Sequence, residues 1–509
     1  MKFISIAYLS LFIFYTFFSS CTDSAPIPAY DLIITNGKII DGTGGAPYDG
    51  HIFIQGDSIV AINSELSPLL PDSILYDAQG QIITPGFIDL HAHGNPLQTP
   101  DFQNFTAMGV TTIVLGQDGS SPAYANLADW QKEIQQQGIG LNIATFIGHG
   151  TLREMTDINS TPIGTTQQMD SMKTLLRNNL AVCFGMSTGL EYAPGLYAEA
   201  DEMIALAKIV GEQNRLIMSH IRNEDDDQIA KSLQELLEQG EHARVHVSHL
   251  KVVYGKGAER AEQILDLLQT ARNAGVEVTA DVYPYNASST GIGIVFPKWS
   301  KTDAQFKQIK NTRRAELLAF LRQKVTRRNG PAATLLGTAP YTGKTLADLE
   351  TERGKPFEEI LVDEIGPQGA SGAYFVMNEA LQSRLLQDSL VGICSDGSPT
   401  MHHPRGYGTF AKIIETYVQQ EQLFSLETAI YKTTGLAADI LSINNRGRIA
   451  EGMKADLVIF NPDEVRATAT YDNPKQLATG FNTVIVNGKF VRKKGTFTDE
   501  RNGQILLPD

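Results

Sequence analysis

The middle of this 509-residue chain repeats one pattern eight times: a short apolar run, then a stretch that favours a helix. Repeated β-α units predict a parallel sheet, and eight of them predict a closed (β/α)8 barrel of the α/β class. An open doubly wound sheet is the alternative, but no glycine-rich phosphate loop supports it. The expected strands are Phe87–Leu90, Thr111–Leu115, Asn142–Phe146, Ala181–Gly185, Leu216–Met218, Val245–Val247, Val276–Ala280 and Leu390–Ile393.

Both ends of the chain predict antiparallel strands instead. Asn36-Gly37 and Asn487-Gly488 each stand between apolar β-forming residues, which is the strongest short signal for a hairpin with a type I′ turn. Neither end alone offers enough strands for a core. We therefore expect residues 30–85 and 449–509 to meet in one small β-sandwich, with the barrel over residues 86–448.

The repeat is stretched in one place, between Pro297 and Asp388. Basic, helix-favouring residues around Arg313–Arg328 and pieces rich in Gly and Pro lie here. An insertion over the barrel mouth, at about residues 297–388, is the prediction, and such insertions often act as lids. A long final β-α connection is the other interpretation.

The first 21 residues predict export. Phe3 to Phe18 is almost wholly apolar, Lys2 precedes it, and Ser19-Ser20-Cys21 follows. This stretch is short for a transmembrane helix, which needs about 20 residues, and it fits a signal peptide. A Cys directly after small residues resembles the lipobox of bacterial lipoproteins, which implies a lipid anchor at Cys21 and a periplasmic or outer-membrane location. Plain secretion or an uncleaved anchor is the alternative.

Composition narrows the partners. The formal net charge is −15, and no run rich in Lys and Arg supplies the basic face that a nucleic acid needs. Three cysteines cannot build a disulfide framework. Cys183 and Cys394 lie in or beside apolar runs and are expected to be buried in strands. The expected partner is a small molecule, and the membrane is expected to be reached through Cys21 alone.

The first expected barrel strand ends in two histidines, His91 and His93. Alternation along a strand turns both side chains to one face, and at the carboxyl end of a barrel strand that face points into the mouth. Metal-capable residues also follow later strands: His220, His249 and Asp396. Structural histidines scatter along a chain, whereas these coincide with strand ends. The pattern predicts a metal site.

Across residues 30–489 the chain resembles the amidohydrolase superfamily and, within it, the D-aminoacylases (N-acyl-D-amino-acid deacylases). Ordered short segments carry the resemblance. They include Ile83 to His93, Gly148 to Arg153, Gly189 to Gly195, Ser219 to Glu224, Ser248 to Lys251, Asp281 to Tyr285, Ser395 to Pro399, His403 to Arg405, Gly408 to Phe410, Arg446 to Ile449 and Ala455 to Val458.

The resemblance implies a site for one or two zinc ions. His91, His93 and Asp396 would form one metal position, and His220 and His249 the other. D-aminoacylases complete the second position with a Cys after the second strand, where this chain has Asp118 in Gly116-Gln117-Asp118-Gly119. Many superfamily members bridge two metals with a carboxylated Lys at the fourth strand, but the run Cys183 to Ser187 has none.

For catalysis, Asp396 is placed to accept a proton from water and to pass it to the leaving amine. Three residues just after metal-ligand or strand-end positions should line the mouth, and two cations with a phenol suit a substrate α-carboxylate. These are Arg222, Lys251 and Tyr283; Tyr192 and Ser289 are weaker candidates.

The expected reaction is zinc-dependent hydrolysis of N-acyl-D-amino acids, or of dipeptides ending in a D-residue, to a D-amino acid and a carboxylate. The preference for D-residues rests on the resemblance. One alternative is a cyclic-amide hydrolase of the dihydroorotase or hydantoinase type, which the missing fourth-strand Lys disfavours. Another is an inactive exported binding protein, which the five intact metal-type residues disfavour.

Overall fold

The computed structural model describes residues 30–63, 65 and 74–508, so the expected signal peptide and Cys21 lie outside the described residues. Eight parallel strands follow one another around a nearly closed barrel, which confirms the predicted fold class. The barrel closes where Asp396 N–H donates to the carbonyl of His91 at 2.8 Å. The strands are β6 (Phe87–Asp89), β7 (Val110–Leu115), β8 (Asn142–Gly148), β9 (Gly185–Gly189), β10 (Leu216–His220), β11 (Arg244–Val247), β12 (Val278–Val282) and β16 (Val391–Ile393).

Most strand residues are buried because helices cover the outside of the barrel while side chains fill its inside. All six residues of β7 are buried, for example. The helices that follow the strands show one apolar face each, as α6 does with Ile229, Leu233 and Leu236. They are α1 (Gln103–Thr106), α2 (Leu127–Gln137), α3 (His149–Met155), α4 (Thr166–Asn179), α5 (Ala200–Glu212), α6 (Ile229–Gln239), α7 (Ala258–Asn273), α12 (Glu379–Gln387), α13 (Arg405–Lys412), α14 (Leu426–Thr433) and α15 (Gly435–Leu441).

The fourth barrel strand begins later in the sequence than predicted. The predicted run Ala181–Gly185 is the turn that leads into β9, which starts where that run ends. Cys183 is buried, but it lies in this turn and not in a strand. Cys183 and Phe184 are buried in the apolar core, whereas the strand that follows them, β9, consists mainly of small residues. As a result, the residues that follow the true strand end are Leu190 and Glu191.

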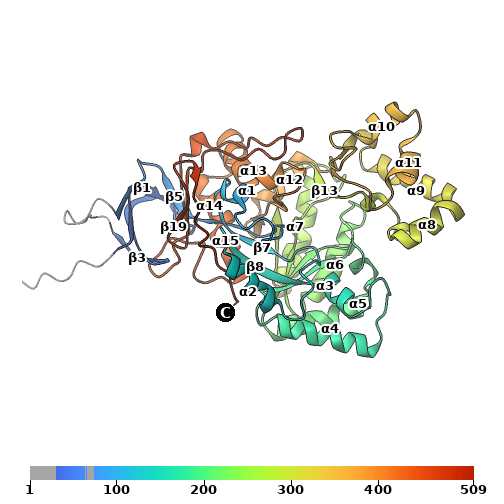
Figure 1. Ribbon diagram of the computed structural model, residues 1–509, viewed down its shortest axis with the longest axis horizontal. Helices are drawn as coiled ribbons and strands as arrows, with labels where there is room; N and C mark the ends of the chain where they lie inside the picture. Colours follow the sequence, from blue (N-terminus) through green and yellow to red (C-terminus); the bar gives the residue numbers. More distant parts are fainter. Residues whose placement is uncertain (1–29, 64, 66–73, 509) are drawn as a thin grey trace, which may run out of the picture.

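Strands from both chain ends share one nine-stranded sheet beside the barrel (Figure 1). The junction is the antiparallel pair β5 and β17. Asn487-Gly488 forms the predicted two-residue hairpin between β18 and β19, with φ of 48° and 78°. The strands are β1 (Leu32–Ile39), β2 (Tyr48–Gln55), β3 (Ser58–Asn63), β4 (Leu75–Asp77), β5 (Ile82–Pro85), β17 (Leu457–Phe460), β18 (Thr483–Val486), β19 (Lys489–Lys493) and β20 (Thr496–Phe497).

The other predicted hairpin is wrong. Asn36 and Gly37 lie inside β1, which continues through them and pairs with β2 across a register shift between Ile34 and Gly37. Asn36 has a φ of 51°, so its left-handed backbone makes a bulge and not a turn. A Cβ on Gly37 would lie 2.4 Å from Cδ1 of Ile83, so the strand passes too close to β5 for any larger residue.

The segment that follows the seventh barrel strand in sequence and precedes the eighth forms an additional layer of the molecule. It holds a three-stranded sheet and four helices around a separate apolar core, and Figure 1 shows its helices at the end of the molecule away from the terminal sheet. After this layer, α12 returns to the barrel and packs on α7. Its elements are β13 (Ser288–Gly291), β14 (Thr334–Leu336), β15 (Ser371–Tyr374), α8 (Asp303–Thr312), α9 (Arg314–Arg327), α10 (Leu346–Arg353) and α11 (Phe357–Ile360).

Among the described residues, no helix has the length and apolar character needed to span a membrane.

Candidate active site

Six side chains from the carboxyl ends of five barrel strands meet at the barrel mouth. Their imidazole nitrogens and carboxylate oxygens form two overlapping groups, and within each group the ligand-type atoms lie within 4.8 Å of one another. Asp118 belongs to both groups. The first group is His91, His93, Asp118 and Asp396, and the second is Asp118, His220 and His249.

Asp118 occupies the centre of this cluster. Its Oδ1 lies 3.3 Å from Nε2 of His91, 3.2 Å from Nε2 of His249 and 3.7 Å from Nδ1 of His220. Its Oδ2 lies 3.5 Å from Nε2 of His93. The carboxylate therefore stands where a group shared by two metal positions would have to stand. Although burial alone raises it, the pKa of Asp118 is held well below its usual range by His91 and His249.

Local backbone geometry aims these side chains. Asp118, His249 and Asp396 have φ values of 54°, 38° and 48°, in the left-handed region that non-glycine residues rarely adopt. Beside Asp118, Gly119 is also left-handed, and a Cβ there would lie 2.7 Å from the backbone nitrogen of Gly189. Strained backbone of this kind collects at functional sites, where the surrounding structure holds it.

Two buried glutamates orient the histidines of the second group. Oε2 of Glu191 lies 3.4 Å from Nε2 of His220, and Oε1 of Glu224 lies 3.2 Å from Nδ1 of His249. Each carboxylate faces the ring nitrogen that points away from Asp118, as carboxylates behind metal-binding histidines do. Lys251 joins this layer: its Nζ lies 2.6 Å from Glu224 and 2.7 Å from Nδ1 of His249.

The donor set fits a zinc ion. Imidazole and carboxylate are the usual ligands of catalytic zinc. His91 is fully buried, and neither of its ring nitrogens forms a hydrogen bond within the described part of the chain. A buried imidazole without a hydrogen bond is costly unless another partner, such as a metal, takes its lone pair.

Asp396 has a dual environment. One oxygen, Oδ1, faces Nε2 of His93 at 3.2 Å and therefore belongs to the metal-type cluster. The other, Oδ2, lies 2.8 Å from Nη1 of Arg405. Burial alone raises the pKa of Asp396, but Arg405 and His249 outweigh it and hold the pKa far below its usual range. The carboxylate is thus ionised at neutral pH.

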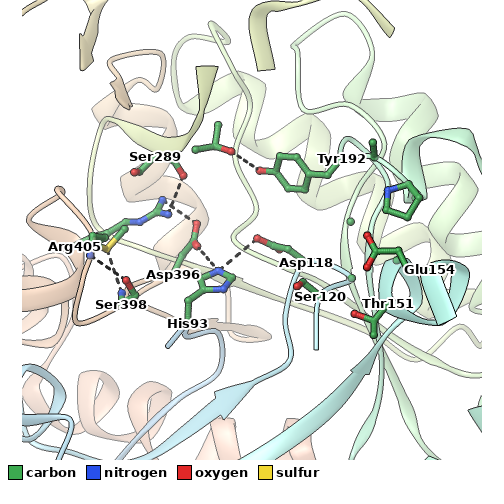
Figure 2. A pocket seen from close by; sticks show the side chains of 18 residues that line it. His93, Asp118, Ser120, Thr151, Glu154, Tyr192, Ser289, Asp396, Ser398 and Arg405 are labelled. Carbon is green, nitrogen blue, oxygen red and sulfur yellow. Dashed lines mark hydrogen bonds and ion pairs between the residues drawn. The ribbon is translucent and has the colours of Figure 1, made fainter. Parts of the chain in front are cut away.

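A cavity of about 430 Å³ opens over the cluster (Figure 2). His93, Asp118, Asp396 and Arg405 line it, and Tyr192 and Ser289, two of the predicted substrate residues, line it as well. In Figure 2, Arg405 and Asp396 lie on one side, with Asp118 beyond them.

The other predicted substrate residues are placed differently. Tyr283 is buried beside the site, with the Arg405 guanidinium 4.8 Å from its ring centre and with no hydrogen bond from its hydroxyl to a described residue. Arg222 does not reach the site. It pairs with Glu235 on α6 at 2.6 Å, donates to the carbonyls of Leu196 and Ala198, and lines a separate hollow. Its side chain is turned outward, although it follows His220 closely in sequence.

Sequence reasoning missed Arg405, Glu191 and Glu224 as site residues. A signal existed, since all three belong to short segments that carry the resemblance. Arg405 is the first residue of α13, the helix that follows the eighth strand. Glu191 was missed because the fourth strand was placed too early.

Comparisons with known proteins agree with this geometry. A family model described as the Amidohydrolase family matches residues 184–492. The chain is 32% identical to the N-acyl-D-aspartate deacylase of Alcaligenes xylosoxydans xylosoxydans, over 96% of this chain and 97% of that one. It is 30% identical to the D-aminoacylase of the same organism, over 96% and 99% of the two chains.

The fold has a close match among solved structures. The crystal structure of N-acyl-D-glutamate deacylase from Bordetella bronchiseptica, complexed with zinc and a phosphonate inhibitor, has a TM-score of 0.82 and 30% identity, and the match covers 94% of this chain and 100% of that one. The similarity therefore covers nearly the whole chain. The chain belongs to the amidohydrolase family.

Proposed function

We propose that this protein is a zinc-dependent hydrolase of N-acyl-D-amino acids, including dipeptides that end in a D-residue, and that it releases a free D-amino acid and a carboxylate. Family membership makes the chain a metal-dependent amide hydrolase. One observation supports an N-acyl amino acid as the substrate: the cluster of zinc-type donors and the guanidinium of Arg405 share a single cavity.

His91, His93 and Asp396 would hold one zinc ion, and His220 and His249 a second, with Asp118 shared between them. When bound, zinc supplies Lewis acidity, which activates water at neutral pH and polarises a carbonyl oxygen. Glu191 and Glu224 keep the rings of His220 and His249 turned toward the centre.

Arg405 and Tyr283 suit the α-carboxylate of the substrate. Nε of Arg405 and the hydroxyl of Tyr283 are buried donors without a hydrogen bond to any described residue. Buried donors of this kind are costly unless a ligand satisfies them, and a guanidinium suits a carboxylate best. Lys251 adds positive charge nearby, with its Nζ 5.6 Å from the ring centre of Tyr283. Tyr192 and Ser289 line the space above.

Asp396 is the proton carrier in this scheme. Its carboxylate lies between the cluster and Arg405, so it is within reach of both the attacking water and the leaving nitrogen of a substrate held by Arg405. It would accept the proton of water and return it to the amine, which prevents the amide from re-forming.

Support for D-residues comes from the relatives. The two aligned enzymes are named as acting on N-acyl-D-aspartate and as a D-aminoacylase, and the similar structure is an N-acyl-D-glutamate deacylase. Identity near 30% over nearly the full length favours the same class of reaction here.

A panel of substrates tests the proposal. Zinc-reconstituted protein should hydrolyse N-acetyl-D-amino acids or dipeptides ending in a D-residue, with the L-enantiomers far slower. Faster opening of hydantoin or dihydroorotate would favour a cyclic-amide hydrolase instead. Bound zinc without turnover of any amide in the panel would favour a binding protein.

We also propose export and a lipid anchor at Cys21, in the periplasm or at the outer membrane. The support is the apolar stretch from Phe3 to Phe18 followed by Ser19, Ser20 and Cys21.

A further inference from the structure

The cavity over the metal-type cluster has two charged ends. Arg405 lines one end, and Glu154 on α3 lines the other. Figure 2 shows the two on opposite sides of the cavity, with Asp396, His93 and Asp118 between them. The proposed function uses the Arg405 end and the middle, and it leaves the Glu154 end without a role.

Barrel topology explains this separation. Glu154 lies on α3, directly after the third strand β8, while Tyr283 and Ser289 follow the seventh strand β12. The third and seventh strands are four apart in a ring of eight, so their carboxyl ends face each other across the mouth. A substrate whose α-carboxylate meets Arg405 and Tyr283, and whose scissile amide lies over the cluster, must point its acyl group toward α3.

The Glu154 carboxylate is available for a ligand. Glu154 is exposed, and among the residues that the structure describes no hydrogen bond or ion pair to its side chain is found. Ser120 offers a hydroxyl in the same cavity, and Figure 2 shows the oxygens of Glu154 turned into the cavity. Gly119 and Gly150 also line this cavity.

A carboxylate at the acyl end of the cavity disfavours some acyl groups of the substrate and favours others. An acetyl group gains nothing from a carboxylate, and a succinyl group is repelled by it. An α-ammonium group, placed on the carbon next to the scissile carbonyl, gains a charge-assisted hydrogen bond. Charge therefore favours an acyl group that is itself an amino acid.

We propose that Glu154 binds the free α-ammonium group of an aminoacyl substrate, so that the preferred substrates are dipeptides with a D-residue at the carboxyl end. This inference rests on the proposed function and assigns its acyl specificity. The two charged ends of the cavity then bind the two charged ends of the substrate: Arg405 binds the terminal carboxylate, and Glu154 binds the terminal ammonium group.

Three substrates that contain the same D-residue separate the effect of the ammonium charge from that of the scissile bond. Glycyl, glycoloyl and acetyl derivatives share the scissile bond, and the first two differ by an ammonium group against a hydroxyl. For the wild-type holoenzyme, kcat/KM should be about tenfold higher for the glycyl than for the glycoloyl or acetyl substrate, a gain reduced by the solvent exposure of Glu154. Glu154→Gln keeps the shape of the side chain and should lower the glycyl-to-acetyl ratio about tenfold.

Asp170→Asn is the matched control, because it removes an exposed carboxylate from α4 outside the cavity and should leave the ratio unchanged. Hydrolysis of the acetyl substrate with no glycyl preference, or a ratio unaltered in Glu154→Gln, overturns the inference and leaves the proposed function standing. In that case Glu154 is a solvated carboxylate at the rim. If no derivative of any D-residue is hydrolysed, the proposed function fails, and the inference fails with it.

Discussion

Oδ1 of Asp118 lies 3.2 Å from Nε2 of His249, and the same carboxylate also faces His91, His93 and His220. One acidic side chain thus links the two groups of metal-type donors. The resemblance to D-aminoacylases implies a Cys at this position, so this chain replaces a thiolate with a carboxylate at the centre of the site.

The first prediction concerns metal binding by Asp118. Asp118→Ala should lose bound metal and activity together, because the variant lacks the group that both donor groups share. Asp118→Cys should keep zinc and bind manganese and cobalt less well, since a thiolate is a softer donor than a carboxylate. Mass-spectrometric metal analysis of the wild type and both variants provides the measurement. Full zinc occupancy and normal turnover in Asp118→Ala would remove Asp118 from the site.

The second prediction concerns Asp396. Asp396→Asn keeps the size of the side chain but removes the proton acceptor, so kcat should fall by about a hundred- to ten-thousandfold. Zinc at His220 and His249 should remain, because neither residue relies on Asp396 for its position. Steady-state kinetics with parallel metal analysis measures both. Turnover close to that of the wild type would show that another group moves the proton.

The third prediction separates two arginines. Arg405→Met should raise KM for an N-acyl-D-amino acid by about ten- to a hundredfold, because a hydrogen bond to a charged group contributes about 1.5–3 kcal/mol. It should also lower kcat, because the ion pair of 2.8 Å with Arg405 holds the Asp396 carboxylate in position. For the corresponding amino acid amide, which lacks the carboxylate, the KM of variant and wild type should be similar.

Arg222→Met serves as the comparison. Its guanidinium is held by Glu235 and by two backbone carbonyls away from the cavity. That variant should melt at a lower temperature but keep a KM near the wild-type value. A large rise in KM for Arg222→Met together with an unchanged KM for Arg405→Met would reverse the assignment.

The fourth prediction concerns export. Cys21→Ser should move the protein from the membrane fraction to the soluble fraction of a bacterial host, because the residue that carries the lipid would be missing. Fractionation and immunoblotting of both forms measures this. Equal membrane association of the two forms would contradict a lipid anchor at Cys21.

The sequence was sufficient to predict the barrel and the residues that meet in its mouth. The short apolar runs of parallel strands contrast with the helices around them, and the carboxyl ends of such strands meet at one face. The positions of His91, His220 and Asp396 at strand ends therefore determined their meeting without any knowledge of distances.

Errors arose where tertiary contacts decide the outcome. Asn36-Gly37 has the residues of a hairpin turn, yet β1 continues through it because Gly37 packs against Ile83 of a distant segment. Cys183 and Phe184 are buried like strand residues, so burial alone could not show that β9 begins only at Gly185.

The sequence also could not predict the direction in which a side chain points when it follows a strand end. Arg222 follows His220 by two positions and Arg405 follows Asp396 by nine, and nothing in their local sequence shows which one turns inward. In the structure, Glu235 on α6 draws Arg222 outward, while Asp396 and the ring of Tyr283 hold Arg405 inside. Such choices depend on partners that are far away in the sequence.

Chiral analysis of the products of a racemic substrate shows whether the protein releases D-amino acids in a metal-dependent reaction. Protein treated with a chelator and then reconstituted with zinc should be incubated with the racemic N-acetyl and glycyl derivatives of one amino acid. With the reconstituted protein, the free D-amino acid should accumulate until half of the substrate is consumed. The chelated protein should release none. Release of the L-amino acid at an equal rate, or undiminished release by the chelated protein, would contradict it.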